Sequence, residues 1–368
     1  MKNYLDFEKE IKALEEEVDG LKSPFGSEGI SEVDTKKIQN TQQEINEKLK
    51  QTYANLNSWQ RTLVARHEDR PKANFYIKKI FTQFTLLSGD RYFGDDKSVI
   101  SGFGLIDNKS VLIIGQEKGE DLNTRIERNF GMMRPEGYRK CIRLMKLANR
   151  FQIPVVSFID TPGAYPGIGA EQRGQASAIA NSIECCMSLT VPNISIIIGE
   201  GGSGGAIALA SSNKVIMLEN SIYSVISPEG CASILWRDPS KSLQAAEAMK
   251  LTAKDLLKLG IIDEVIPEPL GGAHRDPEAI AADIKYSIIK NLRSFENSSK
   301  EEVYDHRKTK FLQIGREQGF SGSSNLNDTG LSRKESAYHK IKNHIFQNKL
   351  IYIGIGMVLI AGLVSIIY

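Results

Sequence analysis

The chain has 368 residues, of which 41% are hydrophobic, and a formal net charge of +2. That length allows a large core and one or two domains, and the small net charge gives no electrostatic reason to expect nucleic acid as a partner. No CxxC pair occurs among the four cysteines, Cys141, Cys185, Cys186 and Cys231. We therefore expect no zinc site, no other metal on this chain, no disulfide framework, and buried thiols in a reducing cytosol.

Residues 1–70 are predicted as an N-terminal helical region. Apolar residues recur at roughly helical spacing from Leu5 to Leu21, and a second helical pattern covers residues 35–63. The Ser-Pro-Phe-Gly segment at 23–26 separates the two, and Asp-Arg-Pro at 69–71 marks the expected boundary. We expect these helices to pack or to contact a partner, without carrying chemistry.

Residues 71–320 alternate between apolar, β-branched runs and helical patterns. Strands are predicted over residues 98–106, 110–116, 153–159, 194–198 and 214–218, with weaker ones over 223–226 and 261–266. Helices are predicted over residues 136–151, 174–188, 205–211 and 242–250. Buried strands interleaved with helices are typical of an α/β fold.

The end of the chain has a different character. Residues 321–349 begin with a polar, glycine- and serine-rich stretch and are predicted as a linker. Residues 350–368 carry no charge and are long enough to cross a hydrocarbon core as a helix. Lys340, Lys342 and Lys349 precede this segment, which would keep that side cytoplasmic. We expect an apolar tail helix that tethers a cytoplasmic protein to the inner face of the membrane; the alternative is a buried core helix.

Two predicted strands end in glycine-rich turns. Residues 160–169, DTPGAYPGIG, follow the strand at 153–159, and residues 199–205, GEGGSGG, follow the strand at 194–198. Glycine at this density indicates positive φ or a close approach of the backbone to something else. Adjacent strand exits flank one crevice at the carboxyl edge of such a sheet, so we expect a site built largely from backbone amides.

Three interpretations of the second turn compete. Residues 199–204 fit GxGxxG, the dinucleotide fingerprint, with Glu219 at about the distance of a ribose contact. Residues 201–205 fit the hydrolase elbow GxSxG, with Ser203, Asp263 and His274 in triad order. The third is an oxyanion hole of N–H groups at a helix start. The few histidines favour the third, because chemistry run by backbone donors needs few titrating side chains.

Several motifs, in order along residues 1–320, resemble the α subunit of bacterial acetyl-CoA carboxylase carboxyltransferase. They are LDFE at 5–8, ARH at 65–67, RNFGM at 128–132, PEGYRK at 135–140, DTPGAYPG at 160–167, GEGGSGGA at 199–206, SVISPEGCASILW at 224–236 and IPEPLGGAHR at 266–275. The linker and the apolar tail are not part of that family's pattern.

The resemblance implies a crotonase-like fold of stacked ββα units and a transferase. Its partners would be a β subunit that carries a zinc ribbon, in an α₂β₂ assembly with the active site between the subunits, and the biotin carboxyl carrier protein and biotin carboxylase of the same complex. The reaction would move a carboxyl group from carboxybiotin to acetyl-CoA, giving malonyl-CoA for fatty-acid biosynthesis. Biotin would arrive on the carrier, without a covalent bond to this chain.

The resemblance also assigns roles to residues. The N–H groups of Gly204 and Gly205 would hold the biotin ureido oxygen, and no side-chain base would be needed. Arg173 is the candidate for a carboxylate contact; the alternative is a solvated arginine at a helix start. The other candidates for the substrate-binding wall are Gly163, Ala164, Tyr165, Gly201 and Gly202, and core packing is the alternative for Tyr165.

For each of three further features, two interpretations remain open. Residues 227–230 would line the site or form a structural turn. Glu200 would be catalytic, or would form an ion pair or cap near a helix start. A basic stretch would contact CoA phosphates or the carrier, or would be a solvated face; its members are Arg128, Arg134, Arg139 and Lys140.

Overall fold

The computed structural model describes residues 3–22, 25–26, 29–30 and 35–315. The chain divides into two compact units, Met1–Ser321 and Gly322–Tyr368, and the description below concerns the first. The predicted linker and tail helix lie outside the described residues. Within the described ranges, no helix is both long and apolar enough to cross a membrane.

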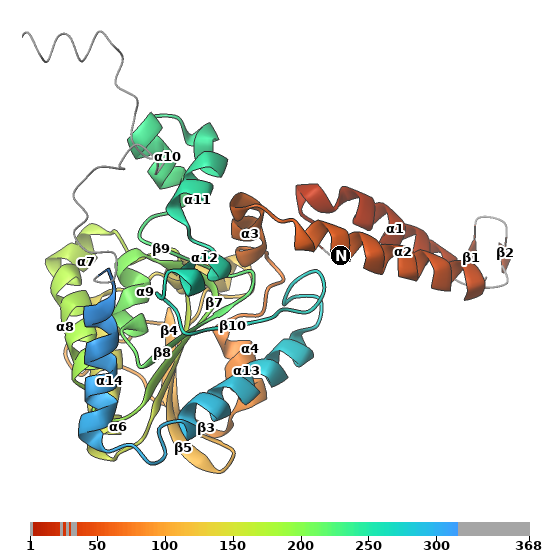
Figure 1. Ribbon diagram of the computed structural model, residues 1–368. Helices are drawn as coiled ribbons and strands as arrows, with labels where there is room; N and C mark the ends of the chain where they lie inside the picture. Colours follow the sequence, from red (N-terminus) through yellow and green to blue (C-terminus); the bar gives the residue numbers. More distant parts are fainter. Residues whose placement is uncertain (1–2, 23–24, 27–28, 31–34, 316–368) are drawn as a thin grey trace, which may run out of the picture. The chain divides into compact units, whose positions relative to one another are not determined.

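A twisted sheet forms the centre of the first unit (Figure 1). Its order is β10-β8-β7-β6-β5-β4-β3, with β9 paired to the end of β7. The β3–β4 and β4–β5 pairs are antiparallel, and the other pairs are parallel. The strands are β3 (Thr82–Leu86), β4 (Val99–Ile106), β5 (Lys109–Gln116), β6 (Val155–Thr161), β7 (Asn193–Gly202), β8 (Lys214–Leu218), β9 (Ile222–Ser224) and β10 (Glu264–Ile266).

Helices cover both faces of the sheet, which explains the continuous apolar strand runs. Along β5, Leu112 and Ile114 enter one core with α6 and α8, while Val111 and Ile113 enter the other with α4 and α13. The helices of this part are α3 (Ser58–Ala65), α4 (Ala73–Ile80), α5 (Leu122–Glu127), α6 (Pro135–Arg150), α7 (Ile168–Gln172), α8 (Gln175–Ser188), α9 (Ser203–Ala210), α10 (Pro228–Trp236), α11 (Ser242–Met249), α12 (Ala253–Lys258), α13 (Pro277–Arg293) and α14 (Lys300–Gln313).

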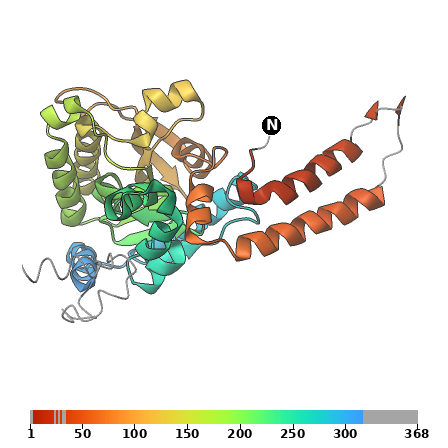
Figure 2. The same ribbon diagram turned by 90° about the horizontal axis from the view of Figure 1, so that it is seen from above.

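The N-terminal region is a pair of helices, α1 (Lys9–Lys22) and α2 (Thr35–Ala54), which lie side by side (Figure 2). Arg275 forms ion pairs with Glu8 and Glu15 and so fastens this pair to the loop before α13. Of residues 69–71, predicted as a boundary, Asp69 is exposed, whereas Arg70 and Pro71 are buried. Arg70 is buried, donates to the Ile198 carbonyl of β7, and pairs with Glu268.

Each predicted strand has a counterpart, but several bounds differ. The strands predicted over residues 153–159 and 223–226 correspond to β6 and β9, and of residues 261–266 only Glu264–Ile266 form a strand. β7 continues to Gly202, four residues beyond the predicted end at 198, because residues 200–202 pair with β9. The prediction that the turn begins at Gly199 is therefore wrong. The edge strand β3 was not predicted, because its residues are mostly exposed and show no apolar run.

Candidate functional site

The turn after β7 is confined to the step from Gly202 to Ser203, the first residue of α9. Ser203 has a φ of 49°, which a non-glycine residue seldom adopts. The chain therefore turns sharply into α9. The N–H groups of Gly204 and Gly205 belong to the first turn of this helix, so they have no carbonyl partner within the helix. A helix start of this kind favours negative charge.

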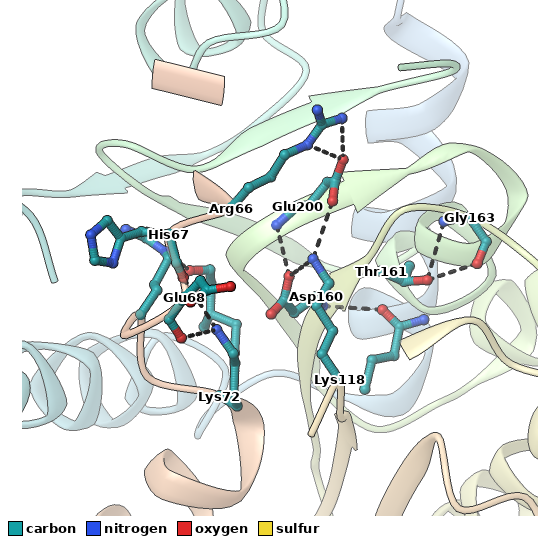
Figure 3. Close-up of polar contacts among 12 residues, drawn as sticks. Arg66, His67, Glu68, Lys72, Lys118, Asp160, Thr161, Gly163 and Glu200 are labelled. Carbon is teal, nitrogen blue, oxygen red and sulfur yellow. Dashed lines mark hydrogen bonds and ion pairs between the residues drawn. The ribbon is translucent and has the colours of Figure 1, made fainter. Parts of the chain in front are cut away.

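The sequence predicted that the two glycine turns flank one crevice, and the structure places them in direct contact. A Cβ on Gly202 would lie 2.1 Å from the Pro162 carbonyl oxygen, and a Cβ on Gly205 would lie 2.6 Å from the Gly163 carbonyl carbon. Thr161 fixes the shape of the first turn, because its hydroxyl bonds to the backbone of Gly163 (Figure 3). Glycine is therefore required at positions 202 and 205, where the backbones of the two turns meet. The close approach that the glycines were predicted to allow is an approach to the neighbouring turn.

A charged cluster lies beside the first glycine turn (Figure 3). The ammonium group of Lys118 lies 2.8 Å from Asp160 and 3.1 Å from Glu200, and the Arg66 guanidinium lies 2.7 Å from Glu200. Burial opposes the charge of Lys118, but the two carboxylates outweigh it and raise the lysine pKa. Arg66 also pairs with Glu229 of α10 at 2.5 Å. The ion-pair interpretation of Glu200 is thus confirmed.

A cavity of about 250 Å³ opens beside this cluster. Lys72 lines it with a side chain that donates to the carbonyls of His67 and Glu68, rather than to a carboxylate. Burial lowers the pKa of Lys72 to about 8, with Lys118 and Arg70 opposing its charge as well. The lining also includes Arg125, Phe130 and Pro162.

Residues 4–315 match the family described as acetyl co-enzyme A carboxylase carboxyltransferase-like. The chain belongs to this family. It is 66% identical over 350 residues to the acetyl-coenzyme A carboxylase carboxyl transferase subunit alpha of Pelagibacter ubique (strain HTCC1062), covering 95% of each chain. It is 51% identical over 324 residues to the subunit of the same name from Rhodopseudomonas palustris (strain HaA2), covering 87% of this chain and 99% of that one. This chain therefore has residues without a counterpart in the second relative.

Solved structures support the crotonase-like carboxyltransferase fold. The transcarboxylase 12S structure with methylmalonyl-coenzyme A has a TM-score of 0.51 at 18% identity, covering 61% of this chain and 41% of that one. A Pseudomonas malonate decarboxylase hetero-tetramer in complex with coenzyme A has a TM-score of 0.50 at 15% identity, covering 61% and 93%. At these identities the likeness concerns the fold alone.

In this carboxyltransferase-like chain, Arg173 lies immediately after α7 and is partly exposed. Its guanidinium lies 2.9 Å from Glu136 and 4.4 Å from the centre of the Phe93 ring. Arg173 is therefore an ion-paired arginine at the surface, and a carboxylate contact would have to compete with Glu136. Tyr165 is half-buried beneath the guanidinium of Arg134, at 4.7 Å, and Ala164 is half-buried beside the core.

The basic stretch is not a solvated face. Lys140 is buried and donates to Asp95 and to two backbone carbonyls, and Arg139 pairs with Asp90 at 2.8 Å. Arg128 donates to the Lys97 carbonyl. Residues 227–230, predicted either to line the site or to form a structural turn, are the N-cap and first residues of α10, and the Ser227 hydroxyl accepts the Gly230 N–H.

The two other motif interpretations of the glycine turn are wrong. Ser203 has the strained φ of a hydrolase elbow, but Asp263 is bound by Lys310 and the Val215 N–H, while His274 stacks on His67. The fingerprint fails because its first two glycines, Gly199 and Gly201, lie within β7, where a dinucleotide site needs a turn.

The prediction that the cysteines are buried thiols is confirmed, because all four are free and buried. Sequence reasoning missed Lys118 and Arg66 as members of the charged cluster, and it missed the buried Gln116 altogether. Their partners lie far away in the sequence, so no local spacing could have pointed to them. Asp160 was part of a quoted motif, but its role as the centre of the cluster was not foreseen.

Proposed function

We propose that this chain is the α subunit of the carboxyltransferase component of acetyl-CoA carboxylase. It transfers a carboxyl group from carboxybiotin, on the biotin carboxyl carrier protein, to acetyl-CoA and so forms malonyl-CoA for fatty-acid biosynthesis. Family membership over residues 4–315 supports the activity. The observation that carries the site is the contact between the two glycine turns, which leaves the start of α9 as a rigid set of backbone donors.

In this proposal the N–H groups of Gly204 and Gly205 bind the ureido oxygen of biotin. Carboxybiotin supplies the carboxyl group, and its loss leaves negative charge on that oxygen. The two amides and the positive end of α9 stabilise this charge. Removing one such donor costs about 2.7–4 kcal/mol of barrier in other enzymes. The backbone of Gly163, Ala164, Tyr165, Gly201 and Gly202 forms the wall of the site.

The three histidines of the described residues are engaged by other parts of the fold. His67 and His274 stack on each other, and His306 belongs to α14. Burial lowers the pKa of each of these imidazoles. We therefore infer that the ring nitrogen of biotin, rather than a side chain of this chain, accepts the proton from the acetyl methyl group.

The site is shared with a partner in this proposal. A β subunit with a zinc ribbon completes it in an α₂β₂ assembly and supplies the hole for the acetyl enolate, while biotin carboxylase recharges the carrier. Ile168 of α7 and Ile234 of α10 are 78% and 70% exposed, as expected of surfaces that a partner covers. Arg173 remains our candidate for a carboxylate contact once Glu136 releases it.

We also keep the proposal that residues 350–368 tether the cytoplasmic enzyme to the membrane. The test is centrifugation of a lysate without detergent. The full chain is expected in the membrane pellet, and its recovery in the supernatant would contradict the tether.

The activity is tested with the full chain, alone and mixed with a zinc-ribbon β subunit. Malonyl-CoA and a biotin derivative are supplied, and the formation of acetyl-CoA by reverse transfer is followed. We expect activity in the mixture only. An inactive but well-formed complex would contradict the proposal and favour a binding scaffold, or an enzyme for a longer acyl-CoA.

A further inference from the structure

Gln116, the last residue of β5, lies between the two glycine turns and contacts both. It is completely buried. Its amide nitrogen donates to the Gly205 carbonyl at 2.8 Å, and its amide oxygen accepts the Asp160 N–H at 3.2 Å. Because one backbone partner only accepts and the other only donates, the orientation of the Gln116 amide is fixed by its surroundings.

The hydrogen-bond network of Gln116 extends through Asp160 to a third strand, β7. The Asp160 carboxylate accepts the Glu200 N–H at 2.9 Å and pairs with Lys118. Gln116 therefore links the first turn of α9 to β6, and Asp160 links β6 to β7. The first turn of α9 is held by the hydrogen bond from Gln116 and by packing against the Gly163 backbone.

We propose that Gln116 is a positioning residue for carboxyl transfer: its amide fixes the first turn of α9 and thereby aims the N–H groups of Gly204 and Gly205. It touches neither substrate nor cofactor. The inference rests on the proposed function, because aiming matters only if those amides bind the ureido oxygen. Preorganised donors lose most of their effect when they are displaced by a fraction of a bond length.

A purely structural role for Gln116 makes a different prediction. A buried side-chain hydrogen bond stabilises the fold wherever it occurs, so its loss would lower stability without a selective effect on turnover. Ser182 provides the matched control. Its buried hydroxyl donates to the Ala208 carbonyl at 2.7 Å, so it also bonds to α9, but near the end opposite to the glycine turn.

The experiment compares Gln116→Leu, Gln116→Glu and Ser182→Ala, each in the full chain assembled with the β subunit. Thermal unfolding, assembly, and the kcat and KM of reverse transfer are measured for each. We expect kcat to fall by about tenfold to a hundredfold in Gln116→Leu, with KM for malonyl-CoA within about twofold of the wild type. Ser182→Ala should lose stability and keep its kcat.

Gln116→Glu adds a signature that a structural role would not produce. Its carboxylate can accept the Asp160 N–H but cannot donate to the Gly205 carbonyl, whereas the protonated acid can do both. Burial raises the pKa of such a carboxyl group, so lowering the pH restores the donor. The kcat of Gln116→Glu relative to the wild type should rise as pH falls from about 8 to about 6, while the ratio for Gln116→Leu stays flat.

The outcomes separate the two proposals. An inactive wild-type complex would overturn the proposed function and this inference with it. An active wild type, with Gln116→Leu as active as Ser182→Ala, would overturn the positioning role alone. If Gln116→Leu fails to assemble, the test is the kcat of Gln116→Glu relative to the wild type as a function of pH. A ratio that does not change with pH would overturn the positioning role of Gln116.

Discussion

Gly205 and Gly163 pack backbone to backbone, so closely that a methyl group on Gly205 would lie 2.6 Å from the Gly163 carbonyl carbon and 2.7 Å from its oxygen. A backbone cannot give way as a flexible side chain can. The start of α9 and the turn after β6 therefore form one unit, although 42 residues separate them (205 − 163).

The same packing predicts the effect of a methyl group at Gly202, which would meet the Pro162 oxygen at 2.1 Å. Gly202→Ala should destabilise the fold by about 1–3 kcal/mol, as overpacked cores do, when measured by urea unfolding. Gly20, exposed in α1 with open space around it, is the control. Gly20→Ala should stabilise by up to about 1 kcal/mol. Equal midpoints for Gly202→Ala and the wild type would show that the turns do not touch.

Arg307 anchors α14 to the end of α8 and the segment after it, so its removal should lower the free energy of unfolding. Its guanidinium is completely buried and donates to the carbonyl of Met187 in the last turn of α8 and to those of Leu189 and Val191 just after it. Burial lowers the pKa of Arg307 to about 10. Because Arg307→Ala leaves these acceptors unsatisfied, it should cost about 2–4 kcal/mol in urea unfolding. The exposed Arg293→Ala should cost less than about 1 kcal/mol, and similar losses for both variants would argue against this anchor.

The stacked imidazoles of His67 and His274 predict a loss of stability in acid. Their ring centres are 3.9 Å apart. Burial lowers the pKa of His274 to about 3 from 6.5, and it lowers that of His67 as well. The folded state then binds fewer protons than the unfolded state at intermediate pH, so stability is complete above about 6.5 and falls as pH decreases toward 3.

The measurement is the urea midpoint at pH 7 and at pH 5, for the wild type and for His274→Gln. The variant should lose less stability than the wild type between the two pH values. An identical loss in both proteins would mean that the pair is not the source of acid sensitivity.

The cysteines should be unreactive in the folded protein. Burial raises the pKa of Cys141 to about 12 and that of Cys185 to about 11, so neither forms the reactive thiolate near neutrality. At pH 8 a thiol reagent should modify the native chain slowly and all four cysteines of the unfolded chain rapidly. A thiol that reacts within seconds in the native protein would contradict this burial.

The strands of the central sheet were predictable because they are buried on both faces. β6 and β8 consist almost entirely of buried residues, and such runs are apolar in sequence. β3 could not be found in this way, because it is an edge strand with mostly exposed side chains. The strand character of residues 199–202 was missed as well, because glycine has no strand preference and β9 supplies the pairing.

The site was predictable only in part. The two glycine turns were recognised because each interrupts a pattern locally. The cluster of Lys118, Asp160 and Glu200 could not be predicted, since these residues lie near the ends of three different strands and meet only in the folded sheet. The ion pair of Arg173 with Glu136 spans a similar gap in sequence. Charged residues of this kind have no periodicity that reveals their partners.

The most direct test of the account is the kcat of Gly205→Val in the complex with the β subunit, beside Gly20→Val as a control for substitution at a glycine. Because a side chain at Gly205 meets the Gly163 backbone, Gly205→Val should be less stable than Gly20→Val. In the fraction that assembles, we expect a loss of about a hundredfold or more in reverse transfer for Gly205→Val, and activity close to that of the wild type for Gly20→Val. An assembled Gly205→Val complex that turns over like the wild type would contradict a site built from the amides of this turn.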